Sequence, residues 1–412
     1  MIDAQSWLVL WKLASRNVAR NRRRTALTTL AVGLGVWTSV ALAAFARGIS
    51  GEMADNAIYD LTGHVQVHHP DYPQDPVVSN SIPDSSAKIM QALPPGVVLG
   101  SAARVRVPAV VRSEKKATGV TLVGIDPDAE HGLSFIGDGV ISGRPIEGPD
   151  DQGIVIGQKL AEHLQTALGR RVVVMSQDVN GKLAERGFRI TGIFDAELEA
   201  TEKAFIFCGR GTAQQLLGLG AQISEISIVG QNRDGADAIV NAVQAAVPEA
   251  AVRSWRKAAP FADALLRVQN AFLKFWFLIV VIAVSFGLIN TIFMSIFERA
   301  REFGLIQSLG MRPHNVIVQV ALEAFLVLLG GMVIGNCGAW LTVRALSGGV
   351  DLSRFARGME MMGVSRVVYP TILARDIITA NLFVLVLCLL GSLYPAWKAS
   401  RLPILEALHR TH

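Results

Sequence analysis

The sequence has little charge and few cysteines for its 412 residues. Asp, Glu, Lys and Arg make up 18% of it, against about 25% in an average soluble domain. This shortage, with a hydrophobic share of 51%, excludes the composition of an ordinary cytosolic enzyme. Cys337 and Cys388 fall in long apolar runs, and Cys208 is alone in residues 51–265. An intramolecular disulfide framework is therefore excluded for that segment.

Motifs for enzyme catalysis are absent as well. There is no G-x-x-x-x-G-K-[ST] loop to hold ATP phosphates, and no H-E-x-x-H, G-x-S-x-G or paired C-x-x-C pattern. We therefore expect no catalytic residue and no ATP site on this chain. His64, His68 and His69 lie near Asp71, but a strand would place only two imidazoles on one face, too few for a metal site. We predict a strand at the entrance of a domain there.

What the sequence does have is four long uncharged apolar stretches. Each holds 20 to 23 residues, and about 20 apolar residues in a helix cross the roughly 30 Å hydrocarbon core of a bilayer. We therefore predict four transmembrane helices. The first stretch is longer than the apolar core of a signal peptide, so we expect it to remain as an anchor. The stretches are Thr25–Ala46, Phe275–Phe297, Ala324–Val343 and Ile377–Trp397.

Charge divides the chain at the same places. Residues 51–265 carry a net charge of −7 and the rest carries +12. The arginines at 20–24 abut an apolar stretch, which indicates retention on the cytoplasmic side and argues against a nucleic-acid site. Twelve Lys and Arg fall in residues 1–24, in the turn after the second stretch and in the tail, against five in the loop 344–375. This asymmetry predicts that both termini are cytoplasmic.

The predicted fold class is an α-helical membrane protein with four transmembrane helices and a large extracytoplasmic α+β domain inserted between helices 1 and 2. We expect a cytoplasmic amphipathic interfacial helix at 1–24, transmembrane helix 1 at 25–47, the extracytoplasmic domain with stalks at 48–270, transmembrane helix 2 at 271–297, a cytoplasmic coupling helix at 298–314, transmembrane helix 3 at 315–343, an extracytoplasmic loop at 344–375, transmembrane helix 4 at 376–397 and a cytoplasmic tail at 398–412.

Short alternating or β-branched runs indicate the secondary structure of the inserted domain. The predicted strands are Gly63–His69, Arg104–Val111, Gly119–Ile125, Gly153–Ile156, Arg171–Val174, Gly187–Ile193, Ala204–Phe207 and Glu225–Val229. The predicted helices are Ser86–Leu93, Gln158–Leu168, Gly211–Leu217 and Asp234–Val247.

Two further patterns concern the membrane part. In Ser6–Arg20, Trp7, Leu10, Trp11 and Ala14 share one helical face and basic residues occupy the rest, as in a helix that lies in the membrane interface. A flank that only sets the topology is the alternative. The polar residues within the apolar stretches are few, and they favour interhelical hydrogen bonds over a transport pathway. Among them are Asn290, Thr291, Asn336 and Asn381, with Glu323 at one border.

Three motifs resemble those of a known family. The turn after the second stretch reads E-R-A-R-E-F-G-L-I-Q-S-L-G from Glu298 to Gly310, and the tail reads Y-P-A-W-K-A-S-R-L-P-I-L-E-A-L from Tyr394 to Leu408. Before the first stretch, R-N-V-A-R-N-R-R-R-T begins at Arg16. With one span, a large domain and three more spans in that order, the whole chain resembles FtsX/MacB-type ABC transporter permeases. Within them it is most similar to the lipoprotein-releasing (LolC/LolE-type) branch.

The resemblance implies a function. Such a chain is the permease subunit of a type VII ABC transporter in the bacterial inner membrane. It works by mechanotransmission and extracts or exports a lipoprotein, lipid or other amphipathic substrate from the outer leaflet. The implied partners are an ATP-binding cassette ATPase subunit that carries ATP and Mg, a second permease subunit in a homodimer or a heterodimer, membrane lipid and a periplasmic protein. The chain itself would bind no cofactor.

Two alternatives stay open. One is an FtsX-like regulator that activates an extracytoplasmic partner without transporting a substrate. The other is a membrane-anchored binding protein with no ATPase.

The resemblance also implies a site. The family's coupling helix matches Glu298–Gly310, whose charged and apolar residues would dock on the ATPase, and whose glycines permit close approach and a helix stop. The candidate coupling residues are Glu298, Arg299, Arg301, Glu302, Phe303, Gly304, Leu309 and Gly310. No substrate-binding residue is predicted.

Overall fold

The computed structural model divides into two compact units. The first contains residues 1–49, 267–350 and 368–412, and the second contains residues 50–266 and 351–367. The structure describes residues 4–137, 139–196, 198–232, 235–308, 311–355, 358–359, 363–365 and 367–400. The predicted tail lies outside these residues beyond position 400.

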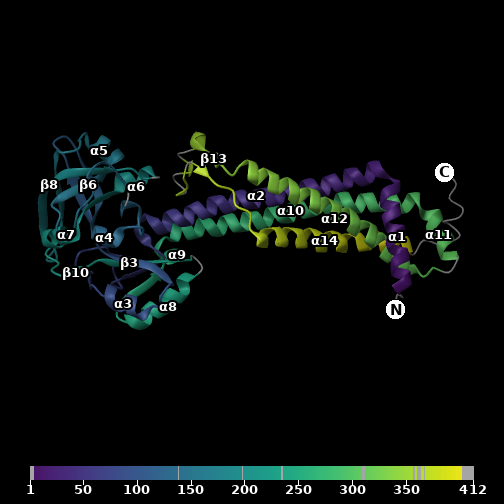
Figure 1. The fold of residues 1–412 in the computed structure, drawn as a ribbon, viewed down its shortest axis with the longest axis horizontal. Helices are drawn as coiled ribbons and strands as arrows, with labels where there is room; N and C mark the ends of the chain where they lie inside the picture. Colours follow the sequence, from purple (N-terminus) through teal and green to yellow (C-terminus); the bar gives the residue numbers. More distant parts are fainter. Residues whose placement is uncertain are drawn as a thin grey trace. The chain divides into compact units, whose positions relative to one another are not determined.

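Long helices make up the first unit (Figure 1). Among the described residues, four helices are long and apolar enough to cross a membrane, and each contains one of the four uncharged stretches. The helices are α1 (Ala4–Arg20), α2 (Arg22–Ala57), α10 (Pro260–Glu298), α11 (Ala300–Ser308), α12 (Pro313–Ala345) and α14 (Ala374–Ser400). The helix α10 begins well before the uncharged stretch that starts at Phe275, as the predicted stalk requires.

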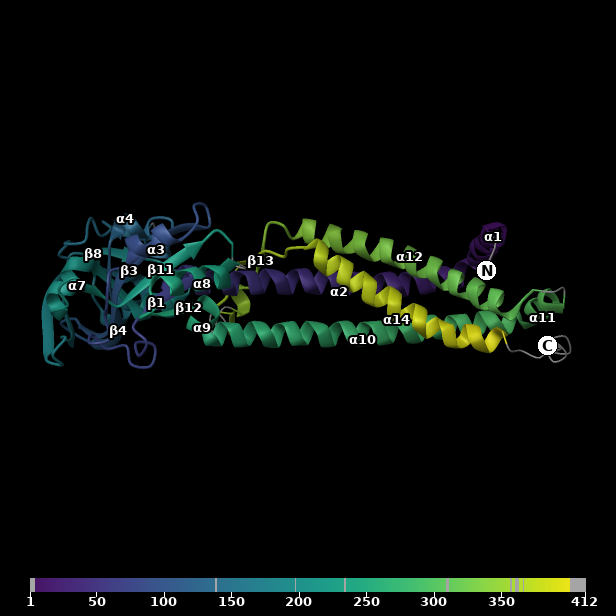
Figure 2. The same cartoon turned by 90° about the horizontal axis from the view of Figure 1, so that it is seen from below.

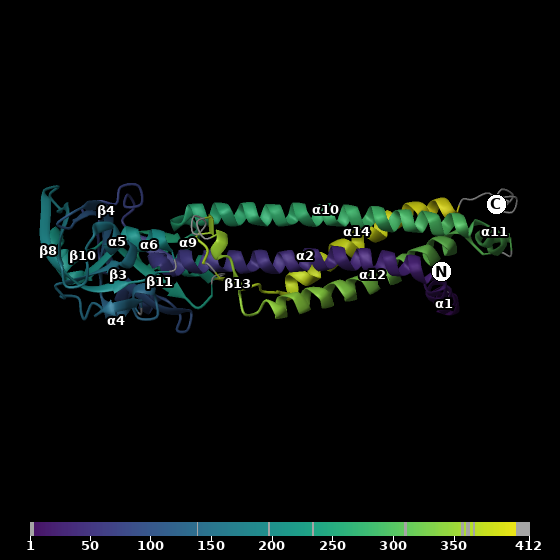
Figure 3. The same cartoon turned by 90° about the horizontal axis from the view of Figure 1, so that it is seen from above.

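Apolar side chains from all four long helices share one core, for example Val36, Leu288, Leu328 and Val384. Figure 2 shows α12 and α14 lying along each other, and Figure 3 shows α2 beside α12.

Glycines on α12 allow α2 and α12 to approach each other closely. A Cβ atom added at Gly331 would lie 2.5 Å from Cγ1 of Val32, and one added at Gly335 would lie 2.6 Å from the carbonyl oxygen of Gly33. Glycines four residues apart thus let two helices touch, as they do in membrane bundles.

The predicted hydrogen bonds between helices are present for three of the four polar residues. Asn336 of α12 and Asn381 of α14 donate to each other, at 3.0 and 3.2 Å. The hydroxyls of Thr28 on α2 and Thr291 on α10 are 3.1 Å apart. These pairs fix the rotation of neighbouring helices where apolar contacts alone are not specific.

The N-terminal helix α1 buries only part of the apolar face that its pattern predicted. Leu10 and Ala14 are buried against Leu322 of α12. Trp7 and Trp11 are 46% and 42% exposed. Exposed tryptophans suit the membrane interface, and this placement of α1 stays a prediction.

The second unit is built on a ten-stranded sheet with the strand order β12-β1-β11-β3-β4-β9-β6-β8-β5, in which β7 pairs with β3 and β8. Its strands are β1 (Val65–His68), β3 (Val98–Arg112), β4 (Ala117–Ile125), β5 (Val140–Gly143), β6 (Gly153–Gly157), β7 (Arg171–Gln177), β8 (Leu183–Phe194), β9 (Phe205–Gly209), β11 (Glu225–Gly230) and β12 (Ala251–Ser254). The short strands β2 (Ile82–Pro83) and β10 (Gln222–Ile223) form a separate pair.

Short helices pack on this sheet. They are α3 (Ser86–Ala92), α4 (Pro127–Glu130), α5 (Gln158–Leu164), α6 (Glu199–Ala204), α7 (Arg210–Leu217), α8 (Ala236–Ala246) and α9 (Trp255–Ala258). In the loop after α12, β13 covers Val350–Asp351 and β14 covers Val367–Val368.

All eight predicted strands and all four predicted helices are confirmed, with shifted ends. The predicted helix Gln158–Leu168 was too long, because Gln165 has a left-handed backbone (φ 52°) whose N–H caps α5 after Leu164. Cys208 is buried in β9, as expected.

The histidines before and in β1 are buried and make local contacts with the backbone of the sheet domain. His64 and His68 are each 3% exposed. The Nδ1 atom of His64 accepts the N–H of Gly230 at 3.1 Å, and Nδ1 of His68 lies 3.0 Å from the carbonyl of His69. Among the described residues, no three His, Cys, Asp or Glu side chains are placed to hold a metal ion.

The end of α2 is anchored by a backbone turn that the sequence did not predict. A π-helical turn follows at Ile58–Thr62, and Leu61 in it is fully buried with φ at 77°, a strained conformation for a branched residue. Nη1 of Arg104 donates to the Leu61 carbonyl. Arg104 itself is buried and forms a two-pronged pair with Glu130, at 2.6 and 2.7 Å. The turn persists because these contacts hold it.

We predict that residues 51–265 fold without the membrane helices, since the apolar residues of this segment fill the cores of its own unit. The purified segment should remain soluble and show a single cooperative thermal transition by circular dichroism. A gradual, non-cooperative melt would show that its core depends on the remaining chain.

We also predict that the same segment becomes less stable as the pH rises from about 4 to 6. Burial raises the pKa of Asp60 to about 6, and a hydrogen bond of 2.8 Å from Thr201 only partly opposes this. A raised pKa means that the folded state binds the proton more tightly, so its stabilisation is complete below pH 4 and lost above pH 6, by about 3 kcal/mol. Urea titrations should show this loss, and Asp60→Asn should abolish it. An equal slope in both proteins would refute the assignment.

Candidate coupling site at the turn between α10 and α11

The chain turns sharply at Arg299, between the end of α10 at Glu298 and the start of α11 at Ala300. The N–H of Arg299 still donates to Ser295 and Ile296, and its carbonyl accepts the N–H of Phe303, each at 3.0 to 3.2 Å. The backbone therefore stays hydrogen-bonded through the turn. The predicted coupling segment does contain a separate helix.

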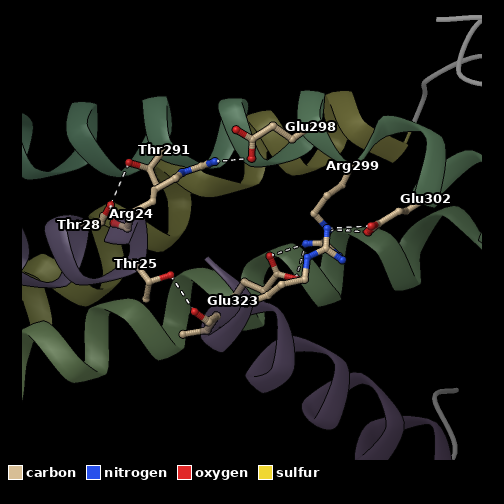
Figure 4. A network of polar contacts seen from close by, with 10 residues as sticks. Arg24, Thr25, Thr28, Thr291, Glu298, Arg299, Glu302 and Glu323 are labelled. Atoms are coloured by element: carbon tan, nitrogen blue, oxygen red, sulfur yellow. Dashed lines mark hydrogen bonds and ion pairs between the residues drawn. The ribbon is translucent and has the colours of Figure 1, made fainter. Parts of the chain in front are cut away.

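The side chain of Arg299 points inward and connects three elements (Figure 4). Its Nη1 donates to both carboxylate oxygens of Glu323 on α12, at 2.9 and 3.1 Å, and its Nε donates to Glu302 on α11 at 3.1 Å. The guanidinium also lies over the ring of Phe303, 4.9 Å from its centre. Arg299 is only 8% exposed, so two carboxylates and an aromatic face compensate its burial.

Glu323 also joins the N-terminal helix to this network. Nδ2 of Asn17 on α1 donates to Glu323 at 2.7 Å. A small cavity of about 100 Å³ lies beside these groups, and its lining includes Asn17, Arg24, Arg299 and Glu323. The half-buried carboxylate of Glu323 thus connects α1, α12 and the turn.

Two arginines from the basic N-terminal motif bind the acidic residues of the turn. Arg20 lies 2.8 Å from Glu302 and Arg24 lies 3.0 Å from Glu298. Burial acts to raise the pKa of Glu302, but hydrogen bonds from Arg20 and Arg299 outweigh it and hold the pKa below its usual range. Glu302 therefore stays ionised under physiological conditions.

The helix α11 has an inner and an outer face. Ala300, Phe303 and Gly304 are buried, and Phe303 belongs to the core of the long helices. Arg301 and Leu305 are exposed, with Leu305 at 54%. They lie four residues apart and so share one face of the helix.

These positions change the predicted docking surface. Phe303, expected to fill a groove of a partner, packs in its own chain because Arg299 covers its ring. Glu298 and Glu302, expected to face a partner, are paired with arginines of the N-terminal segment. The candidate residues Leu309 and Gly310 lie outside the described residues.

Sequence reasoning missed Leu305 and the pairing of Arg299 with Glu323. The four-residue spacing from Arg301 to Leu305 places both on one face of a helix, but their exposure is known only from the structure.

Comparison with known proteins agrees with this architecture. Residues 25–250 match the model of the MacB-like periplasmic core domain, and residues 274–404 match that of the FtsX-like permease C-terminal domain. This chain belongs to the MacB- and FtsX-type ABC transporter permeases.

Individual relatives in this permease family are distant. The lipoprotein-releasing system transmembrane protein LolC of Xylella fastidiosa is 21% identical over 394 residues, which are 92% of each chain. The macrolide export ATP-binding/permease protein MacB of Syntrophobacter fumaroxidans is 31% identical over 132 residues, 32% of this chain and 16% of that protein. The crystal structure of the periplasmic region of MacB from Actinobacillus actinomycetemcomitans is 12% identical, with a TM-score of 0.35, and covers 51% of this chain and 95% of that one.

We predict that Arg299→Leu destabilises the helical unit by about 2–3 kcal/mol, because it leaves the half-buried Glu323 carboxylate without its counter-charge. The double variant with Glu323→Leu should recover much of the loss. A dye that reacts with buried Cys388 on unfolding can follow the melt in detergent, in a Cys208→Ala and Cys337→Ser background that leaves Cys388 as the one thiol. Equal melting temperatures for the single and double variants would count against this ion pair.

Proposed function

We propose that this chain is the membrane subunit of a type VII ABC transporter and that it transmits the work of a separate ATPase subunit by mechanotransmission. The four apolar helices then span the inner membrane with both termini in the cytoplasm. The family and the lack of an ATP phosphate loop support this proposal. ATP and Mg bind to the partner, and the partner's hydrolysis supplies the energy.

The observation that carries the proposal is the two-faced helix α11. Its outer face exposes Arg301 and Leu305, a cation beside an apolar side chain, which suits a groove on another protein. Its inner face is fixed to the long helices through Phe303 and through the contacts of Arg299 with Glu302 and Glu323. A displacement of α11 by a partner must therefore move α10 and α12 with it.

The helices that receive this displacement are long. Helix α10 continues from the turn at Glu298 back to Pro260, and α2 continues to Ala57, both beyond their uncharged stretches. A helix is stiff along its axis because every backbone group is bonded within it. The two helices are therefore suited to transmit this displacement to the extracytoplasmic domain.

The proposed substrate is a lipoprotein, lipid or other amphipathic molecule taken from the outer leaflet. The similarity to a lipoprotein-releasing transmembrane protein over 92% of both chains favours this class. The transporter needs a second permease subunit as well as the ATPase, and a periplasmic protein is the proposed recipient.

We predict that Arg301→Glu combined with Leu305→Glu weakens binding of the ATPase subunit about tenfold or more. The change reverses the charge and removes the apolar side chain of the outer face, while the inner contacts of α11 remain. Co-purification of the ATPase from native membranes in mild detergent measures the loss.

The matched control is Arg23→Glu, which makes the same charge reversal at an exposed arginine on the same predicted side of the membrane. If the double variant retains its ATPase as well as the control does, α11 is not the docking element. If no ATPase accompanies the unaltered chain, the transporter assignment itself fails.

A further inference from the structure

The cavity of about 100 Å³ beside Glu323 lies at one end of three of the apolar stretches. Its lining includes Arg24, Ser295 and Ala324. Arg24 directly precedes the first stretch, Ser295 lies near the end of the second, and Ala324 begins the third. When such stretches span a bilayer, their ends lie at the level of the lipid headgroups. The cavity is therefore at headgroup depth.

The lining of this cavity changes from polar to apolar along the helices. Asn21, Arg24 and Ser295 line the part near the ends of the stretches. Leu288 and Ile292 line the part that lies within them. The cavity has room for more than one water molecule. A lining of this kind suits a ligand whose polar group is attached to an apolar body.

Three side chains in the lining have hydrogen-bond donors that no described residue accepts. Nη2 of Arg24 is buried without a partner, although Nη1 of the same guanidinium donates to Glu298 at 3.0 Å (Figure 4). The Ser295 hydroxyl and the Asn21 amide also form no hydrogen bond to the residues that the structure describes. A buried guanidinium N–H without an acceptor is costly. These donors therefore fit an acceptor that a ligand supplies.

The charge of the lining favours an anion. Three arginines and two glutamates line the cavity, which leaves one positive charge. Of the two carboxylates, Glu298 already accepts a hydrogen bond from Arg24. Glu323 accepts hydrogen bonds from Asn17 and Arg299. At headgroup depth, the anion whose oxygens accept from a guanidinium, a hydroxyl and an amide is a phosphate group.

We propose that this cavity binds the phosphate group of an anionic phospholipid of the cytoplasmic leaflet. Arg24 and Ser295 donate to the phosphate oxygens, and the apolar lining contacts the adjoining carbons of the lipid. The inference rests on the proposed function, in that it takes the apolar helices to span the inner membrane with cytoplasmic termini. Arg24 belongs to α2, and Ser295 belongs to α10, about one helical turn before Arg299. A bound phosphate thus joins these two helices beside the proposed coupling turn.

Lipid binding by the delipidated full-length chain in detergent tests this site. Native mass spectrometry during a titration with phosphatidylglycerol measures the bound fraction. Arg24→Gln should weaken binding about tenfold or more, because it removes the charged donor. Ser295→Ala keeps every charge and should weaken binding several-fold. The matched control is Arg23→Gln, which removes the same charge from an exposed neighbour outside the lining and should leave the affinity within about twofold.

A second comparison separates phosphate binding from a merely structural role of the pair between Arg24 and Glu298. Glu298→Gln breaks this ion pair but keeps the arginine. Phosphatidylglycerol should then bind at least as tightly as it does to the unaltered chain. If Glu298→Gln weakens binding as much as Arg24→Gln does, the ion pair only holds the shape of the cavity and the proposed phosphate contact is wrong.

Two further ligands identify the source of the phosphate. Diacylglycerol, which has the acyl chains but no phosphate, should bind far more weakly than phosphatidylglycerol, and inorganic phosphate should not displace the lipid. Equal binding of diacylglycerol, or displacement by inorganic phosphate, would overturn the assignment to a phospholipid. Equal affinities of Arg24→Gln and Arg23→Gln for phosphatidylglycerol would show that the cavity holds only water.

Co-purification of the ATPase from native membranes is measured separately. A retained ATPase with no lipid bound at the cavity refutes this site alone. Lipid binding that depends on Arg24, with no ATPase in the membranes, refutes the transporter assignment alone.

Discussion

The charge of Arg299 is the constraint on which the helical unit most depends. A guanidinium that is 8% exposed requires counter-charges, and it finds them on α11 and α12 through Glu302 and Glu323. Because Glu323 also accepts a hydrogen bond from Asn17, the same compensation draws in α1. One buried cation thus joins three elements that the apolar core alone would leave free to slide. Its position at the break between α10 and α11 makes the break rigid.

A few polar contacts determine how the helices of this unit are arranged relative to one another. Moving an apolar side chain from lipid to a contact with a neighbouring helix changes its free energy little. The specific arrangement of the helices must therefore come from close packing and hydrogen bonds. Here Gly331 and Gly335 allow α12 to approach α2, while the Asn336–Asn381 and Thr28–Thr291 pairs set rotation. Asn290 is the exception, because its side chain is exposed and forms no hydrogen bond to any residue that the structure describes.

Strong patterns made most of the fold predictable. Uncharged runs located the four long helices, and alternation located eight strands, because both signals come from side-chain burial that acts over many residues. The π-helical turn at Leu61 was not predictable, since Arg104 and Glu130, distant in sequence, hold its strained backbone. A helix was expected in the segment 298–314 and α11 lies there, but the sequence did not indicate which of its residues are buried. A helical pattern does not tell which of its acidic residues will pair with an arginine that is distant in the sequence. Here Glu302 pairs with Arg20 of the N-terminal segment.

The basic segment before α2 therefore has two physical roles, and the same residues serve both. Positive charge near a first apolar stretch fixes topology during insertion and needs no particular partner. In the folded unit, Arg20 and Arg24 are bound to Glu302 and Glu298 at defined distances. The second role ties the start of the chain to the turn on which the proposed coupling depends.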